Sequence, residues 1–447
     1  MFYRNALADL QKWADNRDRK PLVLRGARQV GKTSLVNLFS QGFDQFLSLN
    51  LEQPSHRELF ERDYPVDELI GAIHFVLKAT PSSGKVLLFI DEIQNSPKAI
   101  NYLRFLREEA GHLFVIAAGS LLETLLDRSI HIPVGRVEYL PVYPCNFTEF
   151  LYAGNDPTAL EALRTVPCPD FAHTRLMSLF NRFALTGGMP EVVGQYWANG
   201  NVPGLARIFD SLMVSYLDDV EKYARNSSAV HVIRHVIRQS FIMAGSRVRF
   251  EGFGQSGYRS REVAEAFRTL EKAMILQLVY PVTNTRLPII EDSRKSPKLM
   301  VVDSGMLNYF AGVQDDLFNS QSIADVYKGR FAEHLAGQEI RSLSRSVLNR
   351  LNFWIRPKID ADAEVDFVYP YQGMLIPIEV KSGAIGKLRS LHQFMESAPH
   401  PFAIRIYSGE LSVQDVRLPS DREIKLLNLP FYLISQLDRY LEWFVSR

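Results

Sequence analysis

The sequence has little of what marks secreted or membrane-spanning chains. Only two cysteines, Cys145 and Cys168, occur among 447 residues. Their spacing fits neither a disulfide framework nor a zinc site, so we expect a reducing compartment. No apolar run approaches the length of a membrane span, and the opening MFYRNALADL carries charges where a signal peptide has an apolar stretch. These absences predict a cytoplasmic protein that has no contact with a membrane.

An excess of charge of one sign is also missing, since 51 basic and 50 acidic residues leave a net charge of +1. No field over the whole chain attracts nucleic acid, and any nucleic-acid site has to be a local patch. There is no internal repeat and no low-complexity segment. Apolar residues make up 46 % of the chain, as in ordinary globular proteins, and the length predicts two to four domains.

Short apolar strands alternate with amphipathic helices over the first third of the chain, which predicts a parallel, doubly wound α/β sheet. The expected strands lie at 22–24, 46–51, 86–90, 113–118 and 140–143. A mostly helical stretch follows, and then a helix with two strands in the order of a winged helix. The expected units are an α/β core at 1–146, a helical lid or linker at 147–239, a winged-helix-like module at 240–318 and a second α/β domain at 319–447.

A phosphate-binding loop is predicted by the segment GARQVGKT, which follows an apolar strand and precedes a helix. Its glycines let backbone N–H groups turn toward phosphate oxygens. Lys32 offers a charge to the outer phosphates, and the Thr33 hydroxyl can bind Mg²⁺. We therefore expect ATP and Mg²⁺ to be held by Gly26, Ala27, Arg28, Gln29, Val30, Gly31, Lys32, Thr33 and Ser34.

Two adjacent carboxylates, Asp91 and Glu92, end the apolar strand in VLLFIDEIQ, at the edge of a parallel sheet where ligands bind. We assign Asp91 to hold Mg²⁺ through water and Glu92 to act as the base on the attacking water. Ser120 follows the next strand and is placed to touch the γ-phosphate or the water, a plain turn serine being the alternative. The pair of carboxylates favours hydrolysis over binding alone.

The chain resembles the bacterial and archaeal AAA+-type ATPases of the MCM-related clade in the segments GARQVGKTSLV, LNLE, FIDEIQ, AAGSLLE, VGRVEYLPVYPCNFTEFL, TGGMPEVV and YLDDVEKY. Typical members of that clade carry an uncharacterised C-terminal domain. The resemblance runs nearly end to end and implies a homo-oligomer. It also implies an arginine that completes the site or reaches a neighbouring subunit. Arg136 matches best and Arg128 second, while a salt-bridged loop residue is the alternative for Arg136.

Residues 231–272 hold eight basic side chains against four acidic ones, a local charge of +4. Around a winged-helix-like segment this excess predicts a face that contacts DNA phosphates. A solvated helix face or a protein-binding surface is the alternative. His231 and His235 have zinc-like spacing without a third ligand, so we expect no metal there. The basic residues are Arg234, Arg238, Arg247, Arg249, Arg259, Arg261, Arg268 and Lys272.

The segment AEVDFVYPYQGMLIPIEVKSG predicts a hairpin that brings Asp366 toward Glu379. Glu379 and Lys381 stand two residues apart and share one face of the return strand. Two carboxylates and a lysine can bind a divalent metal and hold the attacking water or a phosphate. Glu333, on an expected helix upstream, can add a ligand.

This arrangement is similar to the PD-(D/E)XK nuclease core. Asp366, Glu379 and Lys381 match its motif, Glu333 matches its helix acid, and Val365 stands where a proline is common. The similarity implies that the first three residues are catalytic and that Glu333, Asp366 and Glu379 bind metal. The function we expect is ATP hydrolysis coupled to engagement of DNA, with metal-dependent cleavage by the C-terminal domain. The alternatives are an ATP-driven switch with an inert nuclease-like domain, and a machine that docks partner proteins.

Overall fold

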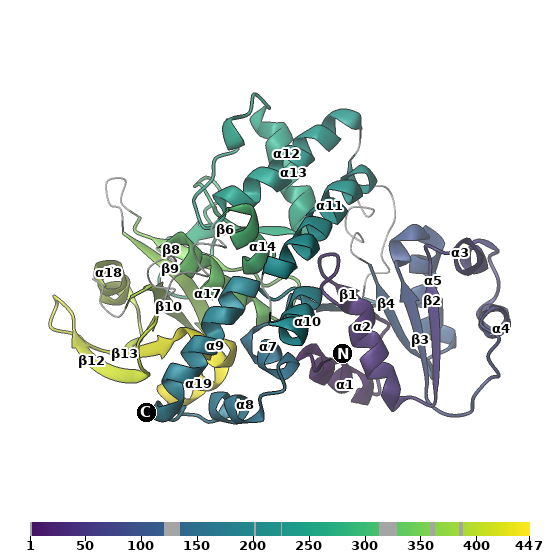
Figure 1. The fold of residues 1–447 in the computed structure, drawn as a ribbon, viewed down its shortest axis with the longest axis horizontal. Coiled ribbons are helices and arrows are strands. Elements are labelled where there is room, and N and C mark those ends of the chain that lie inside the picture. Colours follow the sequence, from purple (N-terminus) through teal and green to yellow (C-terminus); the bar gives the residue numbers. More distant parts are fainter. Residues whose placement is uncertain are drawn as a thin grey trace.

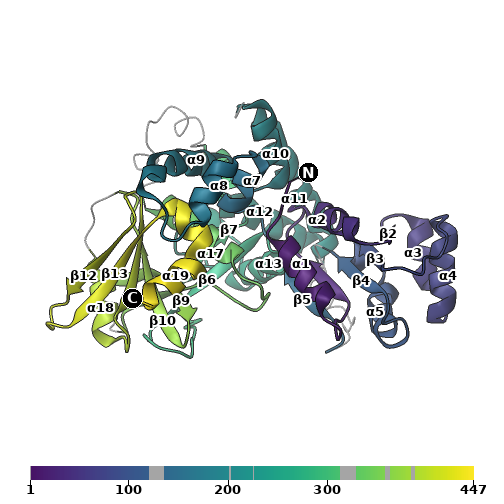
Figure 2. The same ribbon diagram turned by 90° about the horizontal axis from the view of Figure 1, so that it is seen from below.

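Two sheets lie at opposite ends of the molecule, with a group of helices between them (Figures 1 and 2). The structure is a computed structural model that describes residues 2–119, 135–200, 203–224, 226–312, 329–357, 363–383 and 388–447. Within these ranges, no helix combines the length and the apolar character needed to cross a bilayer.

The N-terminal sheet has five strands in the order β2-β3-β4-β1-β5, and all neighbours run parallel. This confirms the predicted parallel α/β sheet. Helices α1 and α2 pack on one face and α3, α4 and α5 on the other, so a central strand such as β3 is buried throughout. The strands are β1 (Leu22–Arg25), β2 (Gln45–Asn50), β3 (Val86–Asp91), β4 (Phe114–Ala118) and β5 (Glu138–Pro141), and the helices are α1 (Ala6–Asp15), α2 (Lys32–Phe39), α3 (Pro54–Glu61), α4 (Val66–Val76) and α5 (Pro97–Glu109).

Helices fill the stretch that the sequence suggests as a lid or linker. The first is capped by Asn146, whose side chain accepts a hydrogen bond from the Glu149 backbone in a capping box. Pro190 stands in the first turn of α10, where its missing N–H has no helical partner to lose. The helices are α7 (Phe147–Ala153), α8 (Pro157–Arg164), α9 (His173–Thr186), α10 (Pro190–Asn199), α11 (Ala206–Tyr223) and α12 (Ser227–Met243).

The second sheet has eight strands in the order β12-β13-β11-β10-β9-β8-β6-β7. Strands β6 and β7 follow helix α13 (Ser260–Lys272), as in the expected winged-helix-like module, yet β6 pairs in parallel with β8. The boundary expected at 318–319 therefore falls within one continuous sheet. The pairing with β8 satisfies backbone groups on the edge of β6 that would stay unpaired in a two-stranded wing. The strands are β6 (Leu276–Val282), β7 (Lys298–Val301), β8 (Asn352–Ile355), β9 (Glu364–Tyr371), β10 (Met374–Val380), β11 (Phe402–Tyr407), β12 (Ser412–Arg417) and β13 (Glu423–Pro430).

One apolar cluster connects the two ends of the molecule. It runs from Trp13 of α1, through Phe150 and Phe183 of the helical group, to Phe444 near the C-terminus. The ATPase core and the C-terminal sheet are thus packed through shared buried side chains rather than joined by a linker alone. The remaining helices are α14 (Ser304–Phe310), α17 (Arg330–Ser342), α18 (Arg389–Ser397) and α19 (Leu437–Val445).

Candidate functional site

The loop between β1 and α2 has the geometry of a phosphate cradle. Gly31 adopts a left-handed conformation (φ 88°) just before the helix begins. A Cβ on Gly26 would lie 2.3 Å from the Val142 carbonyl oxygen, so only glycine fits there. The Lys32 ammonium donates to the carbonyls of Gly26 (3.0 Å) and Ala27 (2.9 Å) inside the loop, and burial lowers its pKa to about 8. The N-terminus of α2 and this lysine together suit an anionic ligand.

A hydrogen bond links the two halves of the predicted nucleotide site. The Thr33 hydroxyl donates to the Asp91 carboxylate over 2.7 Å, because β1 and β3 end at the same edge of the sheet. A hydroxyl and a carboxylate in contact are oxygen ligands that suit Mg²⁺. Glu92 stands next, in a left-handed conformation, and Gln94 donates to its carboxylate. Burial raises the pKa of Glu92, as is useful in a general base.

The structure does not bring every expected residue to this site. Ser120 and Arg128 lie outside the described residues. Arg136 precedes β5, and the pairing of Leu22 with Glu138 places it at the N-terminal edge of the sheet, opposite the P-loop. There it forms an ion pair with Glu108 over 2.8 Å. The expectation that Arg136 contacts the nucleotide of its own chain is therefore corrected. Parallel strands all begin at one edge of the sheet and end at the other, and Arg136 lies where β5 begins, whereas the P-loop follows the end of β1.

Two contacts to the P-loop were not anticipated from the sequence. Arg28 forms an ion pair with Asp219 of α11, which in turn lies 3.0 Å from Lys222. Tyr216, one turn earlier on α11, donates a hydrogen bond from its hydroxyl to the Arg28 carbonyl (3.2 Å). The segment YLDDVEKY contains both α11 residues that contact Arg28. It contributes to the family resemblance, but nothing local in it indicates which residue it meets.

Arg4, near the start of the chain, is fully buried against the same loop. Its guanidinium donates to the carbonyls of Val30 (2.9 Å) and Tyr143 (2.7 Å) and forms an ion pair with Glu149 (3.1 Å). The N-terminal segment, the P-loop and the beginning of α7 are thereby held together. A single buried arginine that contacts three separate segments belongs to no sequence motif, which is why the sequence did not point to it.

Asp303 ties the C-terminal sheet to the neighbourhood of the P-loop. It follows β7, is fully buried, and accepts hydrogen bonds from the backbone N–H groups of Gly188 (2.6 Å) and Met306 (3.0 Å). The carbonyl of Gly188 accepts from Cys145 N–H (2.6 Å). Pro190, two residues on, lies so close to the P-loop that a Cβ on Gly31 would be 3.3 Å from its ring.

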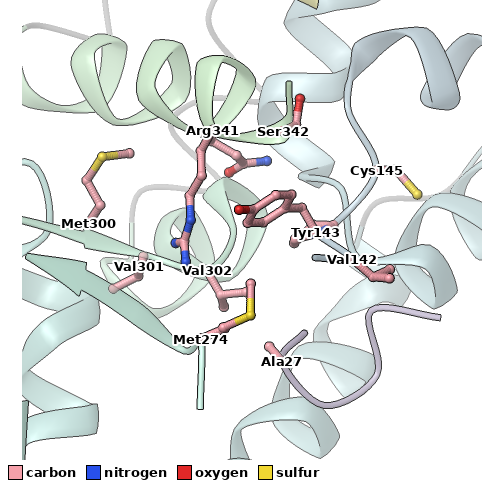
Figure 3. Close-up of a pocket in the computed structure, with 12 residues that line it drawn as sticks. Ala27, Val142, Tyr143, Cys145, Met274, Met300, Val301, Val302, Arg341 and Ser342 are labelled. Carbon is pink, nitrogen blue, oxygen red and sulfur yellow. The ribbon is translucent and has the colours of Figure 1, made fainter. Parts of the chain in front are cut away.

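A small pocket marks the junction of these parts (Figure 3). Ala27 of the P-loop, Tyr143 and the end of β7 line it, and Arg341 of α17 extends into it from the opposite side. The Arg341 guanidinium lies 5.2 Å from the centre of the Tyr143 ring, a distance that suits a cation–π contact. The nucleotide-binding loop and the C-terminal domain therefore line the same pocket, with Tyr143 between them.

The expected C-terminal hairpin forms as strands β9 and β10. Its register pairs Phe367 with Ile378, which sets Glu379 next to Asp366. The Asp366 carboxylate accepts from Val380 N–H (2.8 Å), and the Lys381 ammonium lies 2.6 Å from Glu379. The structure thus places the three residues of the nuclease-like motif side by side.

Around this hairpin the structure adds a lysine to the acidic group. Oxygens of Glu333, Glu364 and Asp366 lie within 4.8 Å of one another. The Lys298 ammonium, on β7, is 2.7 Å from Glu333, 2.5 Å from Glu364 and 3.4 Å from Asp366. Strand alternation already places Glu364 on the same face as Asp366. Lys298 lies in the expected winged-helix-like module, so no local sequence pattern connects this lysine to the carboxylates. We call these residues, together with Glu379 and Lys381, the acidic centre.

Mutual repulsion shapes the charges of the acidic centre. Burial and the neighbouring Asp366 raise the pKa of Glu333 to about 7 and that of Glu379 to about 7. Burial opposes the charge of Lys298, but the surrounding carboxylates prevail and raise its pKa. The lysine is therefore charged at neutral pH and serves as the cation of this group.

Ion pairs neutralise only part of the basic segment 231–272, which we call the basic middle. Arg234 pairs with Glu221 over 3.1 Å, and Arg261 lies 3.7 Å from Glu265. By contrast, Arg238, Arg249 and Arg259 are exposed and form no ion pair with any described residue. His235 faces the carbonyl of Phe253 at 3.0 Å, so one member of the histidine pair already has a backbone partner.

The sheet order, the P-loop and the carboxylates at the end of β3 are those of a P-loop ATPase. In agreement, residues 18–151 match the family model described as an AAA domain. Residues 177–317 and 328–432 match two domains of unknown function, DUF8612 and DUF4143. The family match and the site geometry together support ATPase activity, with nucleotide as the ligand of the loop.

No curated protein sequence matches the chain. Among solved structures, the Walker-type ATPase PABY2304 of Pyrococcus abyssi is similar at 15 % identity, over 69 % of this chain and 96 % of that chain, with a TM-score of 0.45. A STAND-type signal transduction ATPase of Pyrococcus horikoshii is similar at 14 % identity, over 76 % of this chain and 47 % of that one, with a TM-score of 0.28. Because these scores are low, we base the ATPase class on the family match and on the P-loop.

Proposed function

We propose that the protein hydrolyses ATP and couples this turnover to the engagement of DNA. The observation that carries the first part is the Thr33–Asp91 hydrogen bond beside the buried Lys32. Mg²⁺, when bound, would supply positive charge to the phosphates and be held by Thr33 and Asp91. Lys32 would turn its ammonium from the loop carbonyls to the outer phosphate oxygens, and Glu92 would take the proton of the attacking water.

Engagement of DNA is supported by the exposed arginines of the basic middle. Arg238 lies on α12, Arg249 in the following loop, and Arg259 at the start of α13. All three side chains are available to phosphate oxygens because no described acidic group neutralises them. The contacts of Arg28 with α11, and the pocket that Ala27 and Arg341 both line, give nucleotide turnover a physical connection to the rest of the chain.

Metal-dependent cleavage by a PD-(D/E)XK-like C-terminal domain is the finer part of the proposal. Glu333, Asp366 and Glu379 would hold Mg²⁺ or Mn²⁺, whose oxygen-ligand preference they fit. Lys381 would orient the attacking water or the scissile phosphate. The ion pairs of Lys298 favour the second candidate function, an ATP-driven switch whose nuclease-like domain engages DNA without cleaving it.

Ser120, which lies outside the described residues, and Arg136, which lies away from the P-loop, keep proposed roles. Ser120 is assigned to the γ-phosphate or the attacking water. Arg136, with a side chain that is 48 % exposed, is assigned to the nucleotide of a neighbouring subunit in a homo-oligomer. The Glu108 ion pair would then be exchanged for phosphate on assembly.

The test is an ATPase assay with and without single- and double-stranded DNA, run beside a cleavage assay with Mg²⁺ or Mn²⁺. We expect DNA to change the ATPase rate and Lys32→Ala to abolish the activity. Loss of cleavage in Asp366→Ala, with its ATPase activity retained, would support the nuclease. An ATPase rate indifferent to every DNA tested would overturn the coupling, and DNA-responsive turnover without cleavage would select the switch.

A further inference from the structure

The acidic centre already contains most of the positive charge that its carboxylates require. Four carboxylates meet there, those of Glu333, Glu364, Asp366 and Glu379. Opposite them stand Lys298, Lys381 and Arg247, the last paired with Glu364. When all of them are ionised, three positive charges face four negative ones. A divalent ion added to this set would leave an excess of positive charge around the buried Lys298, which is unfavourable where the dielectric is low.

We propose that Lys298 is an internal cation that competes with a divalent metal ion for Glu333, Glu364 and Asp366. Metal enters the centre only when the lysine side chain leaves. This inference rests on the proposed metal-binding role of the C-terminal domain and adds the regulation of that same site. Lys298 is a positioning residue in this scheme, since it acts through the carboxylates that it occupies.

The geometry favours exchange over simultaneous binding. The ammonium touches one oxygen of each of three carboxylates, at 2.7, 2.5 and 3.4 Å. The same three carboxylates each have an oxygen within 4.8 Å of the others, so they could also share an ion. An ammonium and a metal ion therefore compete for the same three carboxylates.

An unsatisfied acceptor indicates that a further cation has a place here. The Glu379 side chain is only 7 % exposed, and one of its oxygens pairs with Lys381. The other oxygen, Oε2, is buried without a hydrogen-bond partner among the described residues. A buried carboxylate oxygen left unpaired is costly, and this one stands beside Asp366 in the hairpin register. A metal ion bound by Asp366 and Glu379 would remove that penalty.

The position of Lys298 also permits it to leave. Strand β7 is the outermost named strand of the second sheet and pairs with β6, while a single bridge joins Lys298 to Arg247 on its other side. The backbone of Lys298 is thus held, and exchange requires only that its side chain turn away from the carboxylates. Phe353, whose ring centre is 5.2 Å from the ammonium, contributes a contact weaker than that of a carboxylate.

The experiment is a titration of the full chain with Mn²⁺ alone, without nucleotide, by calorimetry. Lys298→Met keeps the length of the side chain and removes its charge, and Lys295→Met, at an exposed lysine three residues upstream, is the matched control. We expect Lys298→Met to bind Mn²⁺ roughly tenfold or more tightly than wild type, and Lys295→Met to bind as wild type does. Adding Asp366→Ala to Lys298→Met should abolish the gain.

A second readout covers the case in which Lys298→Met folds poorly, because unpaired carboxylates destabilise it. Mn²⁺ should then raise its melting temperature by more than it raises that of wild type, since a ligand of the folded state stabilises it. Lys298→Arg, which keeps the charge, should show no such gain. Equal Mn²⁺ responses of wild type and Lys298→Met in both measurements would overturn the inference.

The cleavage assay separates this inference from the proposed function. Tighter Mn²⁺ binding by Lys298→Met without DNA cleavage by either protein would uphold the competing lysine and reject the nuclease. DNA cleavage by wild type, together with an unchanged Mn²⁺ affinity of Lys298→Met, would uphold the nuclease and reject the competing lysine. If neither protein binds Mn²⁺, both proposals fail.

Discussion

Arg28, in the middle of the P-loop, forms an ion pair with Asp219 of α11. The Asp219 side chain is only 3 % exposed, so its charge is compensated mainly by Arg28 and Lys222. A helix of the central group is thereby fixed to the loop that cradles phosphate. Any shift of the loop on binding nucleotide has to be accommodated by α11, and from there by the helices packed on it.

The first prediction concerns this ion pair. Asp219→Asn removes a negative charge from the edge of the phosphate site while preserving the shape of the side chain. We expect ATP affinity to rise several-fold, because Arg28 becomes available and a repulsive charge is lost. The melting temperature should fall at the same time, since a buried pair is broken. Fluorescent-nucleotide titration and thermal unfolding measure the two effects.

The neighbouring aspartate supplies the control for this change. Asp218 is exposed on the same helix, so Asp218→Asn alters the net charge equally without touching the P-loop. If both variants bind ATP alike, the Arg28–Asp219 pair has no part in nucleotide affinity.

The second prediction concerns the assignment of the base. Glu92→Gln should retain ATP binding and lose hydrolysis by about 10²-fold or more, because the water loses its proton acceptor. Lys32→Ala should lose binding itself, because the phosphates lose their charge partner. Glu68→Gln, at an exposed position of α4, is the control. Full turnover by Glu92→Gln would require another base.

The third prediction concerns the basic middle. If it contacts DNA phosphates, binding should weaken steeply with salt. Replacing Arg259 and Arg261 together by alanine should reduce the log–log slope by about 1.8, which is two contacts at roughly 0.9 each. Replacing the exposed Arg57 of α3 and Arg62, which follows that helix, should leave the slope unchanged. An unaltered slope in the first variant would place the DNA contact elsewhere, and salt-insensitive binding would point to protein partners.

The fourth prediction concerns pH and the buried Glu339 of α17. Burial raises its pKa to about 8 from an ordinary 4.5, although the Phe147 N–H donates to one carboxylate oxygen at 3.1 Å. Between pH 4.5 and about 8 the folded protein keeps Glu339 protonated, whereas the unfolded chain has released this proton. Its contribution to the free energy of unfolding therefore decreases as the pH rises between these two pKa values, by about 1.4 kcal/mol per pH unit, and is constant above them.

Glu339→Gln removes this titration, so the variant should gain stability relative to wild type as the pH rises from 5 to about 8. Thermal unfolding of both proteins across that range measures the difference. Glu161→Gln, at an exposed position of α8, should follow wild type at every pH. Parallel curves for wild type and Glu339→Gln would show that Glu339 does not carry a raised pKa.

The nucleotide site could be predicted because its parts are encoded locally. Lys32 and Thr33 are consecutive in one loop, and Asp91 ends an apolar strand whose parallel pairing is dictated by the strand–helix alternation. The acidic hairpin of β9 and β10 was predictable for the same reason, since a short turn fixes which residues meet. In each case a few neighbouring residues determine the geometry.

The unpredicted parts of both sites depend on contacts between distant segments. Arg28 and Asp219 are 191 residues apart in the sequence, and Lys298 and Asp366 are 68 apart. Nothing in a local pattern states which charge will lie opposite which. Arg136 shows the reverse case. Its local motif suggested a place at the nucleotide site, but it lies at the start of β5, at the edge of the sheet opposite the P-loop.

The parallel pairing of β6 with β8 has a consequence for how this protein can be divided. Tyr280 lies opposite Asn352 in this pairing, so the strands join the parts that match two separate family models, residues 177–317 and 328–432. Expressed alone, either part would present an unpaired strand edge and an incomplete core. We therefore expect the two parts to fold as one unit and to stay together in any natural rearrangement or engineered chimera.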